Sequence, residues 1–260
     1  MTRFLAPLTV AAMALSLTAC GGSDDDRATD SMTVRSGVLT VCSDVPYAPF
    51  EDFDESAPSG FSGFDIDIVS AVAEGLDLEL QVKDSSFDAL ESGTALNSKQ
   101  CDLAASAITV TEQRAKNLAF SDGYYDSQQS LLVKDGSPVK SIDDLKGKRV
   151  GVQVSTTGET YAEENSPKGT KVVGFPSDAE MFQALKSGVV DALLQDLPVN
   201  VNHARQGGYT VVGEYPTDEV YGLAIRKDNT ELVEAVNGEL KELRDSGKYQ
   251  GLYDTYFSAK

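Results

Sequence analysis

Histidine, tryptophan, cysteine and basic residues are scarce in this 260-residue sequence. It has one histidine, no tryptophan and three cysteines, and its 22 Lys and Arg residues face 41 Asp and Glu residues, which gives a formal net charge of -19. A charge of this sign repels phosphate backbones, so it argues against a nucleic-acid partner, and it opposes electrostatic attraction to an anionic membrane surface. The single His203, without any C-x-x-C pair, excludes the usual zinc sites.

The motifs of common enzymes are missing as well. The sequence contains no nucleophile elbow, no phosphate-binding glycine loop, no dinucleotide fingerprint and no H-E-x-x-H pair. We expect a surface or structural role for His203, and the paired Asp65 and Asp67 suit the first turn of a helix, where acidic groups are favoured. We therefore expect no catalytic residue, no cofactor and no metal ion.

The first residues have the features of a secretory signal. Arg3 is followed by an apolar stretch over residues 4–19, shorter than the about 20 residues that a spanning helix needs. The L-T-A-C sequence at residues 17–20 then resembles the lipobox of bacterial lipoproteins, in which Cys20 carries the lipid; an ordinary signal peptide with an incidental cysteine is the alternative. We predict a lipoprotein signal peptide over residues 1–19. Residues 20–35 should form a lipidated flexible tether, because the Gly, Ser and Asp residues after Cys20 cannot bury a core.

The other two cysteines, Cys42 and Cys101, lie in segments that we predict to be buried strands. They could pair in an oxidising compartment, but a free cysteine is also a common small hydrophobic residue of protein interiors. We favour two free thiols over a disulfide.

Strand and helix patterns alternate along the rest of the chain. Runs rich in β-branched residues predict strands, and apolar residues at helical spacing predict helices. The expected strands cover residues 38–42, 78–82, 102–108, 149–154, 170–175 and 189–194, and the expected helices cover residues 64–76, 87–96 and 178–186, with a final helix that carries Leu232, Val236, Leu240 and Leu243. This order is typical of α/β folds with parallel sheets and helices on both faces.

One short pattern occurs twice. L-x-S-x3-D followed by apolar residues is found at residues 96–104 and again at residues 185–193. Polar residues follow each copy, Ser106 and Thr109 in the first and Gln195 and Asp196 in the second. Because ligands bind at the carboxyl ends of parallel strands, two similar lobes would enclose a ligand between them. A single six-stranded domain is the alternative.

Several ordered segments resemble the polar-amino-acid family of extracytoplasmic solute-binding proteins, the receptors of ABC importers. The strongest is G-F-D-I-D-I-V-S-A-V-A-E-G-L at residues 63–76; others are L-T-V-C-S-D at 39–44, T-V-T-E-Q-R at 109–114, F-S-D-G-Y-Y at 120–125, D-L-K-G-K at 144–148 and V-D-A-L-L-Q-D at 190–196. The resemblance implies a type II periplasmic-binding-protein fold of the Venus-flytrap kind, an α/β fold with two lobes, each a mostly parallel sheet flanked by helices. Lobe 1 would comprise residues 36–125 and 218–260, and lobe 2 residues 126–217, with hinges near residues 124–130 and 213–221.

The resemblance also implies which residues hold the main chain of a bound amino acid. Arg114 matches the arginine that binds the α-carboxylate, for which a planar guanidinium is well suited, and Asp196 matches the aspartate that pairs with the α-ammonium. The same comparison adds the hydroxyl and N–H of Thr109, the carbonyl of Ala107 and, across the cleft, Thr156 and Thr157.

Recognition of the ligand side chain falls to four further positions. Tyr47 and Phe87 match aromatic residues that sandwich the ligand, and Asp44 and Gln153 match residues that face its polar end. The segment at residues 87–96 is about two residues longer than is usual in the family and lacks the common proline, so the match at Phe87 is less close than the match at Arg114. Asp44 together with Gln153 favours a polar or cationic ligand.

We therefore predict an extracytoplasmic substrate-binding lipoprotein that captures an amino acid and delivers it to the transmembrane subunits of an ABC permease. It would be held at the cell membrane by the lipid on Cys20, at the cell surface or in the periplasm, and we expect a monomer without enzyme activity. Two alternatives stay open: an enzyme on the same fold similar to cyclohexadienyl dehydratases, and a ligand-sensing module that acts on a separate membrane partner.

Overall fold

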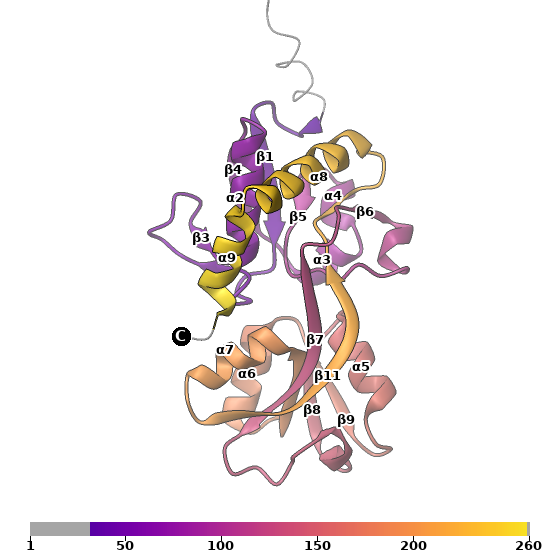
Figure 1. Ribbon diagram of the computed structural model, residues 1–260. Coiled ribbons are helices and arrows are strands. Elements are labelled where there is room, and N and C mark those ends of the chain that lie inside the picture. The colour runs from indigo at the N-terminus through magenta and orange to yellow at the C-terminus, as the bar shows by residue number, and fades with distance from the viewer. Residues whose placement is uncertain (1–31, 259–260) are drawn as a thin grey trace, which may run out of the picture.

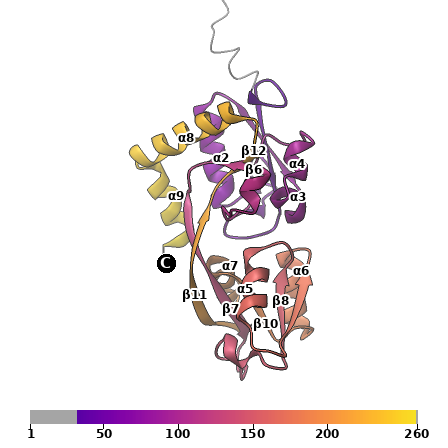
Figure 2. The same ribbon diagram turned by 90° about the vertical axis from the view of Figure 1, so that its right-hand side faces the viewer.

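The computed structural model describes residues 32–258 of the chain. The predicted signal peptide, Cys20 and most of the predicted tether lie outside these residues. Within them the chain forms two α/β lobes that are joined by a pair of long strands (Figures 1 and 2).

Lobe 1, the upper lobe in Figure 1, is built on a sheet with the strand order β4-β1-β5-β12-β6. Its strands are β1 (Val38–Ser43), β4 (Glu79–Asp84), β5 (Leu103–Ala104), β6 (Leu118–Phe120) and β12 (Ala224–Arg226), and a separate ribbon consists of β2 (Asp52–Phe53) and β3 (Phe61–Ser62). Its helices are α2 (Phe64–Gly75), α3 (Phe87–Glu91), α4 (Thr94–Asn97), α8 (Thr230–Asp245), α9 (Lys248–Phe257) and the 3-10 turn η1 (Arg114–Lys116).

Lobe 2 is built on a sheet with the order β11-β7-β10-β8-β9. Its strands are β7 (Tyr125–Lys134), β8 (Arg149–Gln153), β9 (Lys171–Phe175), β10 (Ala192–Asp196) and β11 (Tyr209–Tyr221). Its helices are α5 (Thr157–Asn165), α6 (Asp178–Ser187), α7 (Leu197–Arg205) and the 3-10 turn η2 (Ile142–Leu145).

The two-lobed α/β fold predicted from the sequence is confirmed, with a mixed sheet in each lobe. β1 pairs in parallel with β4 and β5, and β8 pairs in parallel with β9 and β10. The antiparallel pairings belong to β12 in lobe 1 and to β7 in lobe 2. Parallel pairing follows from the helical crossovers, whereas β7 and β12 enter their sheets directly from the connection between the lobes.

β7 and β11 form the connection between the lobes. They pair antiparallel from Tyr209 opposite Lys134 to Tyr221 opposite Tyr125, with register shifts between Val211 and Gly213 and between Tyr215 and Glu219. Figure 1 shows this strand pair running from one lobe to the other. The predicted lobe boundaries, at residues 125–126 and 217–218, fall within these two strands.

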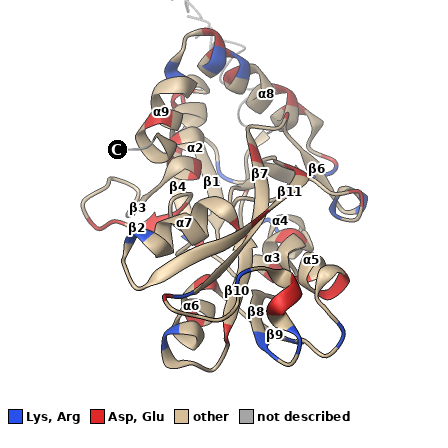
Figure 3. Ribbon diagram, turned by 60° about the horizontal axis from the view of Figure 1, so that its bottom comes forward, with Lys and Arg blue, Asp and Glu red and all other residues tan. Residues whose placement is uncertain are grey.

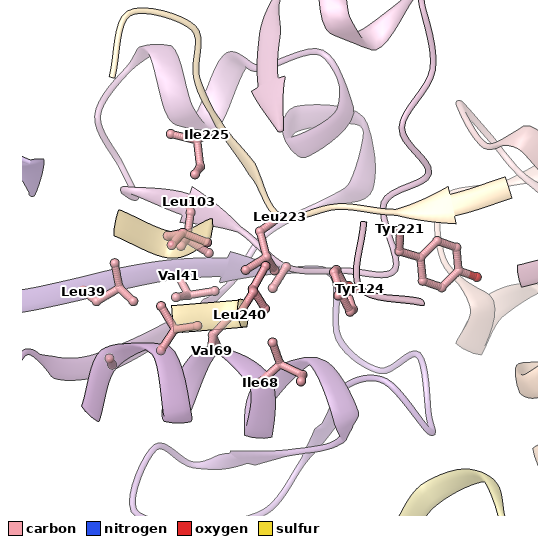
Figure 4. Close-up of a cluster of buried hydrophobic side chains, with 14 of the residues drawn as sticks. Leu39, Val41, Ile68, Val69, Leu103, Tyr124, Tyr221, Leu223, Ile225 and Leu240 are labelled. Carbon is pink, nitrogen blue, oxygen red and sulfur yellow. The ribbon is translucent and has the colours of Figure 1, made fainter. Parts of the chain in front are cut away.

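The core of lobe 1 forms between α2, α8 and the central strands. Val69 of α2, Leu240 of α8 and Val41 of β1 belong to one buried cluster, which Figure 4 shows. Gly63 precedes α2 with a φ of 130°, and a Cβ atom there would lie 2.2 Å from the carbonyl oxygen of Phe50. Only glycine therefore allows α2 to begin so close to the preceding loop. The predicted apolar stripe of the final helix is buried in α8.

The structure departs from the predicted elements in one helix and one strand. The helix expected over residues 87–96 is divided into α3 and α4 by Gly93, whose φ of 79° is left-handed. The strand expected over residues 102–108 is reduced to β5, and Ala107 beyond it has a φ of 46°. Helix α9 and strands β6, β7, β11 and β12 were not predicted. Phe257 of α9 packs against Phe64 with ring centroids 5.0 Å apart.

The repeated L-x-S-x3-D pattern has the same structure in both lobes. The carboxylate of Asp102 accepts the backbone N–H of Thr40 at 2.7 Å, and Asp102 donates its own N–H to the Thr40 carbonyl at 2.8 Å. Asp191 makes the same pair of bonds to Arg149, each 2.8 Å long. In each lobe the aspartate thus joins the returning chain to a central parallel strand, β1 or β8, as expected for two halves that are built alike.

Cys42 and Cys101 form a disulfide, so the expectation of two free thiols is wrong. Both residues are buried, as expected. Cys42 lies near the end of β1, and Cys101 lies two residues before the start of β5, the strand that pairs with β1; their Cα atoms are 5.8 Å apart. The sheet creates this proximity between positions 59 residues apart, which the local pattern at either cysteine does not reveal.

The excess of acidic residues is distributed over the molecule. Figure 3 shows Asp and Glu residues on helices of both lobes, with fewer Lys and Arg residues between them. Among the described residues, the buried acidic side chains are Glu51, Asp65, Asp102, Asp178 and Asp196, so most of the negative charge lies outside the core.

Candidate ligand-binding site

All ten residues predicted to bind a ligand line one cavity between the lobes. The volume inside it that a water-sized molecule can occupy is only about 20 Å³, so the side chains of the two walls nearly fill the cavity. The predicted residues in its wall are Asp44, Tyr47, Phe87, Ala107, Thr109, Arg114, Gln153, Thr156, Thr157 and Asp196. They follow the ends of β1, β5, β8 and β10 or begin a helix, as expected where ligands bind at the carboxyl ends of parallel strands.

Arg114 is 5% exposed and connects the lobes. Its Nη1 donates to the carbonyl of Thr109 at 2.9 Å, and its Nη2 donates to the carbonyl of Ser155 in lobe 2 at 3.0 Å. Nε lies 3.6 Å from the carboxylate of Glu91, and the guanidinium is 5.2 Å from the ring centroid of Phe87. Burial lowers the pKa of Arg114 and the carboxylate of Glu91 opposes this shift, so the side chain is a charged group inside the cavity.

Asp196 ends β10 and is the buried carboxylate of the lobe 2 wall. The hydroxyl of Tyr47 donates to Oδ2 and the amide of Gln129 donates to Oδ1, both at 2.7 Å. Burial, with the nearby charge of Glu219, raises the pKa of Asp196 to about 7. Among residues 32–258 no ion pair includes Asp196, so a cation in the cavity would relieve the cost of its burial.

Asp44 and Gln153 meet across the cleft. The Gln153 amide donates to Oδ2 of Asp44 at 2.6 Å and to the carbonyl of Pro176 at 3.2 Å. Burial raises the pKa of Asp44 to about 6; the bond from Gln153 opposes the shift, and the charges of Asp84 and Asp178 add to it. This part of the cavity therefore presents a second carboxylate in surroundings that favour a positive partner.

Glu219 links the two threonine positions that we predicted on opposite lobes. Its Oε2 accepts from the hydroxyl of Thr109 at 3.0 Å and from the hydroxyl of Thr157 at 2.9 Å. The amide of Gln129 donates to Glu219 Oε1 at 3.1 Å as well as to Asp196. Residues of the connecting strands β7 and β11 thus hold both walls of the cavity together.

Sequence reasoning missed part of the cavity wall. The further lining residues are Ser106, Gln129, Gly158 and Gln195. Ser106 and Gln195 are polar residues at the end of an expected strand, and this position is a signal in the sequence for residues that line a ligand cavity. Gln129 and Glu219 lie within the segments predicted as hinges, but nothing in the local sequence indicates that Gln129 lines the cavity or that Glu219 bonds to residues of its wall.

His203 lies outside this cavity and is buried, with 6% of its surface exposed. Its Nε2 is 2.9 Å from Asp178, and its ring stacks on Phe182 with centroids 3.8 Å apart. These contacts give the residue a structural place in lobe 2, not on the surface. Within the described range, no group of three or more His, Cys, Asp and Glu side chains could hold a metal ion, and no helix is both long and apolar enough to cross a bilayer.

Two α/β lobes joined by a strand pair, with a polar cavity between them, define a two-lobed protein that binds small molecules. The chain belongs to the bacterial extracellular solute-binding proteins, family 3, which it matches over residues 39–259.

Individual relatives agree with this assignment. The chain is 34% identical over 236 residues to the lysine/arginine/ornithine-binding periplasmic protein of Escherichia coli strain K12, covering 86% of this chain and 87% of that protein. It is 31% identical over 265 residues to the arginine-binding extracellular protein ArtP of Bacillus subtilis strain 168, covering 100% of each. A solved ancestral arginine-binding protein bound to glutamine has a TM-score of 0.81 and 38% identity, covering 86% of this chain and 100% of that one. All three of these relatives are amino-acid-binding proteins.

Proposed function

We propose that this chain binds one basic amino acid between its lobes and delivers it to an ABC permease. The cavity wall contains one buried guanidinium, Arg114, and one buried carboxylate, Asp196, and this pair matches the two charges of a free amino acid. Arg114 would bind the α-carboxylate together with Thr109, Thr156 and Thr157. Asp196 would bind the α-ammonium together with the carbonyl of Ala107.

The charge of the cavity favours a cationic side chain. Its lining includes two carboxylates, Asp44 and Asp196, and one base, Arg114. A zwitterion pairs with Arg114 and Asp196, which leaves Asp44 uncompensated. A guanidinium or ammonium on the ligand side chain would pair with Asp44, while Tyr47 and Phe87 would contact its apolar stem.

The ligand would replace contacts that the cavity residues make with one another. The hydroxyl of Tyr47 donates to Asp196 and the amide of Gln153 donates to Asp44, so both carboxylates that we assign to the ligand have a protein partner in this structure. Both bonds join opposite walls of the cleft. A bound amino acid would replace these two bonds by charged contacts to both lobes. The ligand would then bind the closed arrangement of the lobes more tightly than the open one, and so favour closure.

We also propose that Cys20 anchors the protein to the membrane and that the two lobes act on its outer side. The disulfide supports an oxidising location, since such bonds persist mainly outside the cytosol. Cys20→Ala should move the protein from the membrane fraction to the soluble fraction of producing cells. Unchanged membrane retention would exclude Cys20 as the anchor.

A thermal-shift and calorimetric panel with arginine, lysine, glutamine and glutamate tests the ligand class. Arginine and lysine should raise the melting temperature in proportion to concentration over Kd, and glutamate should not, because it adds a third carboxylate to the site. A flat panel would exclude the receptor function, and stronger binding of glutamine than of arginine and lysine would exclude the cationic preference. Asp196→Asn should weaken binding of every amino acid that binds.

A further inference from the structure

Two carboxyl groups lie directly behind the cavity wall, outside the contacts that we assign to the ligand. Glu51 and Asp65 are each 0% exposed, and neither lines the cavity. The fold brings their segments together, because the N–H of Asp65 donates to the carbonyl of Phe50 at 3.0 Å. At Gly63 a Cβ atom would lie 2.8 Å from the backbone nitrogen of Glu51, so the two backbones are in direct contact.

Each carboxyl group has one oxygen with donors and one without a partner. Oε1 of Glu51 accepts from the hydroxyl of Ser106 at 2.5 Å. Oδ2 of Asp65 accepts from the hydroxyl of Tyr124 at 2.7 Å and from the N–H of Ala107 at 2.8 Å. The remaining oxygens, Glu51 Oε2 and Asp65 Oδ1, are buried without a hydrogen-bond partner. A single proton held between the two groups would satisfy both oxygens.

Among the described residues, the groups with the largest electrostatic influence on the pair carry no positive charge. The titratable groups that act on it are acidic or phenolic: Asp44, Asp196, Tyr47 and Tyr124. No ion pair of the described residues includes either carboxyl group. Burial and the charge of Asp65 raise the pKa of Glu51 well above its usual range, and burial raises the pKa of Asp65 to about 7. Two adjacent buried carboxylates would therefore repel each other at neutral pH if both were ionised.

We propose that Glu51 and Asp65 share one proton and together position residues 106 and 107 of the ligand cavity. Ser106, which donates to Glu51, accepts the N–H of Asp44 at 3.0 Å. Ala107, which donates to Asp65, has a left-handed φ of 46° that an alanine adopts only at a cost. Glu51 and Asp65 are positioning residues, because they reach the ligand only through Ser106 and Ala107. The positioning role rests on the proposed function, whereas the shared proton does not.

Infrared difference spectra of the ligand-free protein at neutral pH test the shared proton. Glu51→Gln and Asp65→Asn each replace one carboxyl by an amide, whose N–H can take the place of the proton. Each should remove the carbonyl absorption of a protonated carboxyl group. The control Glu74→Gln, at an exposed position of the same helix α2, should remove the absorption of an ionised carboxylate. Loss of a carboxylate absorption in all three variants would overturn the proposal.

The unmodified protein gives an independent measurement that does not depend on the folding of a variant. Carboxyl-carbon NMR over a pH series should show that the pair retains one proton at about pH 8, above the pKa of about 7 of Asp65, where ordinary Asp and Glu side chains are ionised. Two ionised carboxylates at that pH would also overturn the proposal.

Calorimetric titration with arginine over a pH series tests the positioning role. The affinity of the unmodified protein for arginine should fall at higher pH, as the shared proton is lost. Glu51→Gln should bind arginine within about threefold of the unmodified protein at neutral pH, and its affinity should fall less over the same pH range. Glu51→Leu offers no acceptor to Ser106 and should weaken binding about tenfold. Equal pH profiles for Glu51→Gln and the unmodified protein would refute the role. Absence of arginine binding to the unmodified protein would instead refute the proposed function and leave the infrared result unaffected.

Discussion

Arg114 offers the sharpest test of the proposed site, because its donors can be counted. A guanidinium has five N–H donors. One hydrogen of Nη1 is used by Thr109 and one of Nη2 by Ser155, and Nε faces Glu91. One hydrogen remains on each Nη, enough for the two oxygens of a ligand carboxylate. Arg114→Ala would leave that carboxylate buried without a partner, which costs about 3 to 5 kcal/mol, or about two to three and a half decades in Kd.

The assay is calorimetric titration with arginine, combined with urea unfolding of each ligand-free variant so that a loss of stability is not mistaken for a loss of binding. Arg114→Lys keeps the charge but loses the planar fork, and it should cost about one decade. Arg205→Ala, at an exposed position at the end of α7, is the matched control and should bind like the unmodified protein. Binding by Arg114→Ala within threefold of the unmodified protein would refute the assignment of the carboxylate site.

Three further predictions follow from other parts of the structure. Asp44→Asn should reduce the preference for arginine over glutamine by at least about tenfold, measured as a ratio of Kd values, and an unchanged ratio would exclude Asp44 as the partner of the ligand side chain. Reducing the bond between Cys42 and Cys101, which are 59 residues apart, should lower the free energy of unfolding by about 4 kcal/mol, measured by urea unfolding with and without reductant; equal midpoints would contradict this. Burial raises the pKa of Asp196 to about 7, above its unfolded value of about 3.9, so its contribution to ligand-free stability is present at low pH and is lost as pH rises through about 7. Urea midpoints over a pH series should show this fall, and Asp196→Asn should reduce it.

The recognisable part of the site consists of residues in ordered local motifs. Arg114 ends a T-x-T-x-x-R segment and Asp196 ends an apolar strand, and the family resemblance of these two segments indicates both residues. The cavity also depends on residues without such a signal. Gln129 and Glu219 lie on strands whose pairing and bulges orient their side chains, and their roles become visible only once β7 and β11 are paired.

The sequence by itself determined most helices and the parallel strands, because periodicity and short motifs act over a few residues, and the family resemblance of its segments implied the two lobes and ten residues of the cavity wall. The tertiary structure decided the features that depend on distant partners. It joined Cys42 to Cys101 through neighbouring strands, brought the backbone segments of Glu51 and Asp65 into contact, and gave Glu219 contacts to both lobes. The physical reason is the same in each case: a disulfide, a shared proton or a bridging hydrogen bond requires separations of a few ångströms, and these are set by packing between segments far apart in the chain.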